Sequence, residues 1–223
     1  MKMNQLEKSI VCGLLVAVLA VTASGYSAFA GQCSDIRQNV FRLHILANSD
    51  SAADQQLKLH VRDRILASSG ELFKASVSKV QAIAQVRKKL GEIQRIAQAE
   101  VYREGYSYPV RAQVVHMYFT TRTYGTYILP AGYYDALRIT IGRAAGHNWW
   151  CVLFPPLCLP AAQEDPGTKQ QLEDVLGGTD AGIVTQSGNR TVVLKFKVLE
   201  LYEDAKNFLS ETFSVPSSSG AQQ

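Results

Sequence analysis

The architecture is clearest in the stretch Phe41-Arg42-Leu43-His44-Ile45-Leu46-Ala47-Asn48-Ser49-Asp50, which joins a strand directly to the start of a helix. Apolar residues alternate with Arg42 and His44, which is the period-two pattern of a β-strand over residues 40–47. The polar residues that follow, 48–51, end the strand. Their short side-chain oxygens can accept hydrogen bonds from the first free backbone N–H groups of a helix. The sequence therefore predicts a strand and a helix joined by a short polar corner.

Two helices are predicted after this corner. The first carries apolar residues at steps of four, with Asp54 and Lys58 one turn apart on the solvent side. Residues 68–70 (Ser-Ser-Gly) predict its end, and a longer helix is expected over 71–102. The apolar stripe of that second helix favours packing within the domain. Packing of this kind includes a bend at Gly91, and a helix that projects as a docking arm is the alternative.

From Pro109 onward the pattern changes to strands. Alternation predicts a strand from residue 110, and residues 136–142 and 148–154 are expected to pair as a hairpin. Residues 163–189 have the polar, Gly-rich composition of a variable loop. The fold class is thus predicted as α+β: an N-terminal strand, a two-helix segment, an antiparallel β-sheet region with a disulfide-closed loop, and a C-terminal helix near residues 198–209.

Residues 1–30 have the pattern of a cleavable secretory signal peptide. Lys2 and Lys8 precede a short apolar run over 10–21, and Ala28-Phe29-Ala30 is a small-x-small cleavage site. Cleavage there predicts a mature protein that begins at Gly31, with a flexible segment over 31–39. A single globular domain over 40–210 and a disordered tail over 211–223 complete the predicted organisation. The formal net charge of +4 gives no nucleic-acid footprint.

The four cysteines favour one disulfide. Cys12 leaves with the signal peptide, and Cys151 and Cys158 enclose a Pro-Pro turn, so outside the membrane they are expected to be joined. Cys33 is then a spare thiol. The alternative is a metal site made by Cys33, His147, Cys151 and Cys158, but their spacing is not that of structural zinc. We therefore expect no metal and no cofactor.

The sequence lacks the motifs of common catalytic sites, so an enzyme is not predicted. Trp149 and Trp150 stand out instead, because neighbouring residues on a strand point to opposite faces of a sheet. One of them is therefore expected to be exposed beside the disulfide-closed loop, as in a protein-binding hot spot. The alternative is a sheet whose two faces are both covered.

These segments carry a resemblance to a known family. The sequence resembles the stage II sporulation protein R family of endospore-forming bacteria, with the specific strings Ala-Asn-Ser-Asp and Trp-Trp-Cys. The matching stretches, in order, are residues 43–50, 54–63, 129–132, 136–142 and 146–158, with a looser match over 194–199.

The resemblance implies an exported signal that works between the forespore and mother-cell membranes. Its partner would be a membrane-embedded aspartic protease, contacted on its extracytoplasmic face, that processes the sigma-E precursor; peripheral membrane contact is a further expectation. A secreted hydrolase using Asp50 or His44, and an envelope-binding module, are the alternatives. The residues expected to bind the partner are His44, Asn48, Ser49, Asp50, Trp149 and Trp150.

Overall fold

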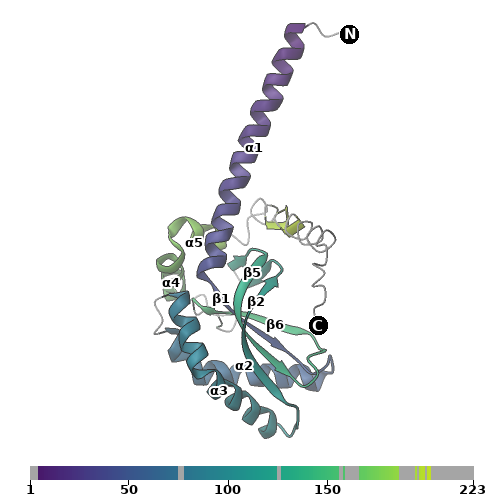
Figure 1. Ribbon diagram of the computed structural model, residues 1–223, viewed down its shortest axis with the longest axis vertical. Helices are drawn as coiled ribbons and strands as arrows, with labels where there is room; N and C mark the ends of the chain where they lie inside the picture. Colours follow the sequence, from purple (N-terminus) through teal and green to yellow (C-terminus); the bar gives the residue numbers. More distant parts are fainter. Residues whose placement is uncertain are drawn as a thin grey trace, which may run out of the picture.

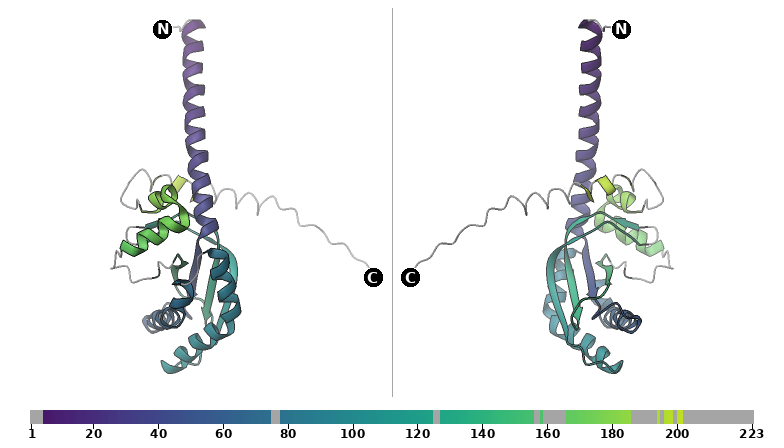
Figure 2. Two further views of the ribbon diagram at one scale, coloured as in Figure 1. Left: turned by 90° about the vertical axis from the view of Figure 1, so that its left-hand side faces the viewer. Right: turned by 90° about the vertical axis from the view of Figure 1, so that its right-hand side faces the viewer.

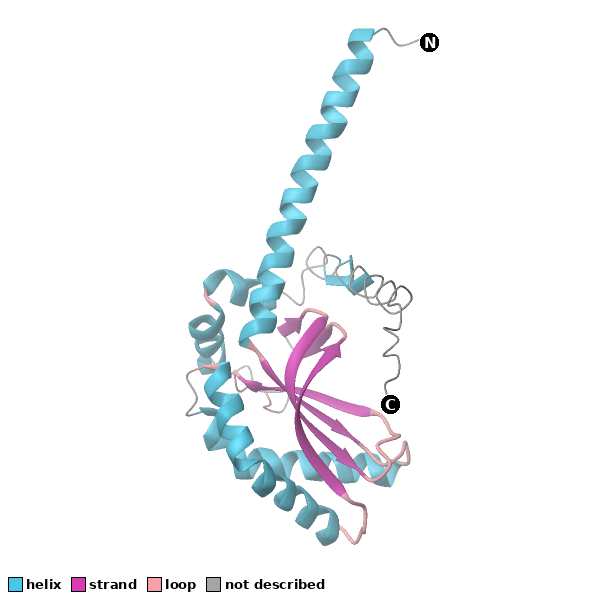
Figure 3. Ribbon diagram, in the orientation of Figure 1, coloured by secondary structure: helices cyan, strands magenta, loops and turns pink. Residues whose placement is uncertain are grey.

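The computed structural model describes residues 5–74, 78–124, 127–155, 158, 166–185, 194, 196–198 and 200–201. It combines helices and strands as the sequence predicts, and the fold is α+β (Figures 1 and 3). In chain order the elements are α1 (Gln5–Asn39), β1 (Phe41–Leu46), α2 (Ala52–Lys74), α3 (Lys79–Arg103), β2 (Val110–Phe119), β3 (Arg122–Tyr124), β4 (Tyr127–Leu129), β5 (Gly132–Ile141), β6 (Asn148–Phe154), α4 (Pro166–Leu176) and α5 (Gly178–Val184).

The main sheet has the strand order β2-β5-β1-β6. Strand β1 pairs in parallel with β5 and antiparallel with β6, while β2 pairs antiparallel with β5. The predicted hairpin of β5 and β6 is therefore wrong, because β1 lies between them. All six residues of β1 are buried. A strand covered on both faces belongs in the middle of a sheet, with a neighbour on each side.

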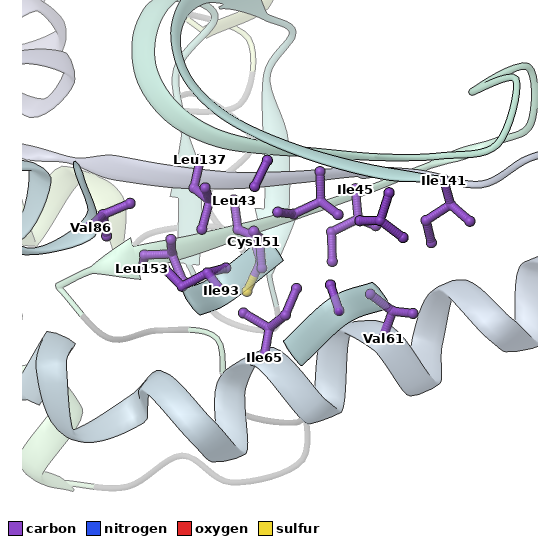
Figure 4. Close-up of a cluster of buried hydrophobic side chains, with 14 of the residues drawn as sticks. Leu43, Ile45, Val61, Ile65, Val86, Ile93, Leu137, Ile141, Cys151 and Leu153 are labelled. Carbon is purple, nitrogen blue, oxygen red and sulfur yellow. The ribbon is translucent and has the colours of Figure 1, made fainter. Parts of the chain in front are cut away.

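One face of the sheet, called the inner face here, packs against α2 and α3. Figure 4 shows strand residues such as Leu43, Ile45 and Leu137 directed toward Val61 and Ile65 of α2. The apolar stripe of α3 joins the same core. The predicted packing role of this helix is confirmed, and the helix ends at Arg103 after 25 residues.

The boundary between the two helices differs from the prediction. Helix α2 continues through Gly70 to Lys74, and α3 begins at Lys79. A glycine inside a helix costs only about 1 kcal/mol, which tertiary packing overrides. The signal missed is Ser78, whose hydroxyl accepts a hydrogen bond from the backbone N–H of Gln81. Ser-x-x-Gln is the pattern of a helix start.

The opposite face of the sheet, the outer face, packs against the end of α1 and against α4 and α5. Two predictions are wrong in this region. Residues 163–189 contain two helices, whose buried Leu172, Ala181 and Val184 join this second core, so they are not simply a loop. Residues 31–39 form the end of α1, where Ile36 is fully buried, so they are not a free segment.

Helix α1 projects well beyond the rest of the molecule (Figure 2). Cys33 on this helix is a free thiol as predicted, but it is fully buried and packs with Phe29 and Phe196 instead of lying in a flexible segment. Burial raises the pKa of that thiol to about 12. None of the helices within the described ranges is long and apolar enough for a membrane span. Most of the predicted C-terminal helix, and the tail over 211–223, lie outside the described residues.

Candidate functional site

The polar corner after β1 starts α2 as the sequence predicts. The hydroxyl of Ser51 accepts a hydrogen bond from the backbone N–H of Asp54 at 3.2 Å, and its carbonyl accepts one from Gln55 at 2.9 Å. The Asp54 carboxylate does not complete a capping box. It turns toward the corner, where it accepts hydrogen bonds from Asn48 Nδ2 at 2.9 Å and from Ser49 Oγ at 2.5 Å.

Asp54 and Lys58 are buried, which corrects the prediction that they face solvent. Their exposed fractions are 3% and 5%. Burial alone would raise the pKa of Asp54, but hydrogen bonds from Ser49 and Asn48, among others, lower it below the usual value. Burial and the nearby Arg62 lower the pKa of Lys58. Helix α2 therefore contributes two buried polar groups to the corner.

The corner is tied to the loop between β5 and β6, almost a hundred residues further along the chain. Asn48 Oδ1 accepts a hydrogen bond from the backbone N–H of Arg143 at 3.0 Å. The backbone N–H of Gly146 donates to the Ala47 carbonyl at 3.1 Å. Only glycine fits at 146, because an added Cβ would lie 2.1 Å from the Ser49 carbonyl oxygen. The two segments form one close-packed unit.

Asp50 and His147 form the exposed rim of this corner. The Asp50 carboxylate accepts hydrogen bonds from the backbone N–H and from Nδ1 of His147. Those bonds, the backbone one first, lower the pKa of Asp50. The side chains of Asp50 and His147 are 54% and 81% exposed. Beneath them, Lys58 Nζ donates to the His147 carbonyl at 3.1 Å and holds the loop against α2. The rim is thus exposed but fixed from below.

Trp149 and Trp150 do point to opposite faces of the sheet, and both are half-buried. Trp149 packs with the core under α2, and the Arg62 guanidinium lies 4.2 Å from its ring centroid. Trp150 packs on the outer face, where its ring stacks on His44 at 4.0 Å. Neither tryptophan stands free of the core as predicted for one of them. Each has a core face and an accessible edge.

The disulfide between Cys151 and Cys158 is present, with a Cα–Cα distance of 5.5 Å. Both sulfurs are therefore used, and Cys33 lies in a separate cluster on α1. Within the described ranges no group of three or more His, Cys, Asp and Glu side chains is arranged to hold a metal ion.

The structure divides the predicted binding residues into two sets. Asn48, Ser49 and Asp50 meet at the corner, whereas His44 is buried on the outer face under Trp150. Sequence reasoning missed His147 as the partner of Asp50. Two glycines four residues apart, at 142 and 146, were the available signal for a tightly packed loop there.

Comparison with known proteins places this corner inside a family match. The model of the family described as "Stage II sporulation protein R (spore_II_R)" matches residues 37–164, more than half of the chain. Stage II sporulation protein R of Bacillus subtilis (strain 168) is 41% identical over 136 residues. That alignment covers 61% of this chain and 61% of the relative, so the match spans less than two thirds of the relative's length. No solved structure matches the chain. The chain therefore belongs to the stage II sporulation protein R family.

Proposed function

We propose that this protein is an exported signal that activates a membrane-embedded aspartic protease during sporulation. The protease then removes the pro-segment from the sigma-E precursor in the mother cell. On this proposal the protein is the ligand, and catalysis belongs to the partner. It acts from the space between the forespore and mother-cell membranes, on the extracytoplasmic face of the protease. The predicted signal peptide over residues 1–30 supports this location.

The observation that carries the proposal is the union of two distant segments in one rigid corner. Residues 41–46 of β1 pair with residues 148–154 of β6, and the loop before β6 is bonded to the corner through Asp50 and His147. Both segments lie in the family match. A surface that is already ordered loses little conformational entropy when a partner binds, which favours recognition. The corner is therefore suited to present Asp50 and His147 to another protein.

The test is an Asp50→Ala variant assayed in sporulating cells. The side chain is exposed, so the variant should remain folded. It should lose most processing of the sigma-E precursor and most co-purification with the membrane domain of the protease. Asp63→Ala is the matched control, because Asp63 is an exposed carboxylate on α2 that forms an ion pair with its neighbour Arg62. Normal processing by a folded Asp50→Ala protein would contradict the proposal.

The Asp50–His147 pair also favours a second candidate, a secreted hydrolase. A carboxylate bonded to Nδ1 of a histidine leaves Nε2 as a potential general base. A catalytic pair would lose about 10⁴-fold in turnover on Asp50→Asn, as in hydrolase triads. If the protein is a hydrolase, the Asp50→Asn protein should still bind its partner. If the protein is a ligand, the same substitution should abolish binding and processing together. Co-purification of Asp50→Asn protein with the protease therefore distinguishes the two candidates.

A further inference from the structure

The charged strand residues on the outer face of the sheet are all basic. Strand register places sixteen residues on this face, and among them are three arginines, one histidine and no Asp or Glu. On the inner side, by contrast, Lys79 is paired with Asp135 at 2.7 Å. The residues of the outer face are Arg42, His44, Leu46, Arg111, Gln113, Val115, Met117, Phe119, Gly132, Tyr134, Ala136, Arg138, Thr140, Asn148, Trp150 and Val152.

Arg42 is a buried cation that forms no ion pair with any carboxylate among the described residues. Its side chain has no exposed area, and its guanidinium carbon lies 4.1 Å from the ring centroid of Phe119 and 4.9 Å from that of Tyr134. It donates a hydrogen bond to the hydroxyl of Tyr124. Within the described part of the chain, its Nε and Nη1 have no hydrogen-bond partner. Aromatic faces stabilise a cation, but they leave its positive charge uncompensated.

A second arginine, with one unsatisfied nitrogen among the described residues, lies one strand away. Arg138 of β5 is the register partner of His44, and its buried Nε also has no partner among the described residues. His44 stacks on Trp150, and the guanidinium of Arg122 lies 5.4 Å from the ring centroid of the same indole. Arg122 is exposed. Unpaired buried N–H groups are rare in native proteins, and a bound anion would satisfy such donors.

We infer that this region binds an acidic segment of a partner protein. The region is named the cationic surface and consists of Arg42, His44, Arg122, Arg138 and Trp150. Carboxylates of the segment bind Arg138 and Arg122 beside the accessible edge of Trp150. Arg42 is covered, so it supplies positive potential from beneath rather than a direct contact. This inference rests on the proposed function, because it gives the activating protein a surface for its partner.

The burial of these basic side chains favours a peptide, rather than a lipid bilayer, as the ligand of the cationic surface. Arg42 is fully buried, His44 is 2% exposed and Arg138 is half-buried. Binding to a bilayer relies on protruding basic side chains that reach a plane of headgroups. Recessed arginines instead suit a slender carboxylate side chain, which a guanidinium can bind through two parallel hydrogen bonds. An extended segment also projects alternate side chains to one side, as β1 does with residues 42 and 44.

The probes are short acetylated peptides, one alternating Glu and Thr and one alternating Gln and Thr. Binding to the full chain is followed by tryptophan fluorescence and calorimetry. The Glu peptide should bind, and the Gln peptide should not. Combined Arg122→Gln and Arg138→Gln substitution should weaken Glu-peptide binding about ten-fold or more, because charged hydrogen bonds to both arginines are lost. The matched control is combined Arg62→Gln and Arg103→Gln substitution, which removes the same charge from the helical side.

Further experiments distinguish a peptide from a lipid as the anionic ligand, and distinguish failure of the cationic surface from failure of the proposed function. Binding of phosphatidylglycerol vesicles without binding of the Glu peptide would overturn the inference in favour of a lipid surface. In sporulating cells the Arg122→Gln, Arg138→Gln protein should fold and lose sigma-E precursor processing. Normal processing by that protein, together with loss in Asp50→Ala, would overturn the cationic surface and leave the proposed function standing. Normal processing by a folded Asp50→Ala protein would count against the proposed function itself.

Discussion

The corner and the cationic surface treat buried polar groups in opposite ways. At the corner, the Asp54 carboxylate and the Asn48 amide are almost fully buried, and hydrogen bonds within the protein satisfy both. On the outer face Arg42 is buried just as deeply, yet two of its nitrogens have no partner in the described structure. Arg42 on β1 and Asn48 in the turn that follows are only six residues apart in the sequence.

This difference assigns separate roles to the two regions: the corner positions other groups, and the cationic surface binds a ligand. Satisfied buried hydrogen bonds fix a single geometry, so the corner is the part of the protein that positions other groups. At the edge of the cationic surface the buried Nε of Arg138 has no partner among the described residues, and it costs free energy until an anion binds it. The cationic surface is therefore the part that gains from a ligand. Substitutions in the corner and in the cationic surface test this difference between the two regions.

The largest effect is expected from Asp54→Ala. Loss of the carboxylate leaves the amide of Asn48 and the hydroxyl of Ser49 without their acceptor inside the corner. Charged hydrogen bonds and newly unsatisfied donors together give an expected loss of about 4 kcal/mol in the free energy of unfolding. Urea denaturation measures it. Asp63→Ala, on the exposed side of the same helix, should change that free energy by less than about 1 kcal/mol.

Equal changes in the free energy of unfolding for Asp54→Ala and Asp63→Ala would mean that the corner does not fix the position of other groups. In that case the hydrogen bonds around Asp54 would contribute no more than a surface ion pair. The assignment of positioning to the corner would then fail.

The next effect concerns acid stability and His44. Burial lowers the pKa of this histidine to about 4, and the neighbouring Arg138 and Arg42 lower it further, while Asn148 opposes them. The unfolded chain, with a pKa of about 6.5, therefore binds more protons than the folded protein between pH 6.5 and 4. The contribution of neutral, buried His44 to the free energy of unfolding is fully present above about pH 6.5 and is lost as the pH falls toward 4. The expected loss is about 3 kcal/mol.

His44→Gln should remove this component of the pH dependence. Above pH 7 the unfolding curves of the two proteins should run parallel, which provides an internal control. Acidic groups with lowered pKa values, such as Asp54, lose their contribution only at lower pH, below their unfolded value of 3.8. A wild-type protein with the same pH dependence as His44→Gln would show that His44 is not buried in a cationic setting. Addition of the Glu peptide should reduce the acid loss in the wild-type protein, because a nearby carboxylate favours protonated His44.

The sequence predicted the elements with clear periodicity. The β1 strand, the start of α2 at the polar corner, the stripe of α3 and the disulfide were all predicted, because each depends on residues close together in the chain. The opposite orientation of Trp149 and Trp150 followed from the two-residue period of a strand. These features need no knowledge of the neighbouring elements.

What failed depends on contacts between distant segments. The insertion of β1 between β5 and β6 is a pairing choice that local pattern does not contain. Asp54 was assigned to solvent because its helical position is polar, yet it is buried against Asn48 from the preceding turn. The pairing of Asp50 with His147 joins residues 97 apart in sequence. Arg42 resembled the polar side of an alternating strand, and only the packing of α1, α4 and α5 shows it to be buried.

The smallest of these stability effects compares two glycines. An alanine at 146 would place its Cβ 2.1 Å from the Ser49 carbonyl oxygen, so the corner would have to move. Overpacking of this kind typically costs about 1–3 kcal/mol, and we expect about 2 kcal/mol for Gly146→Ala. Gly105 also disfavours a side chain, because its φ is +84°, but no atom lies within 4 Å of an added Cβ. Gly105→Ala should therefore cost about 1 kcal/mol, the penalty of the left-handed backbone alone.

The two glycine variants differ more in signalling than in stability. Gly146 is adjacent to His147, so displacement of the loop would move the exposed rim of the corner and reduce sigma-E precursor processing. Gly105 follows α3, and its backbone N–H donates to the Tyr102 carbonyl at the end of that helix rather than to the loop of His147. Processing is measured at a temperature where both proteins are fully folded. If Gly146→Ala and Gly105→Ala process the precursor equally well, the position of the rim does not matter for activation. The corner would then be a structural joint, and recognition would rest on the cationic surface.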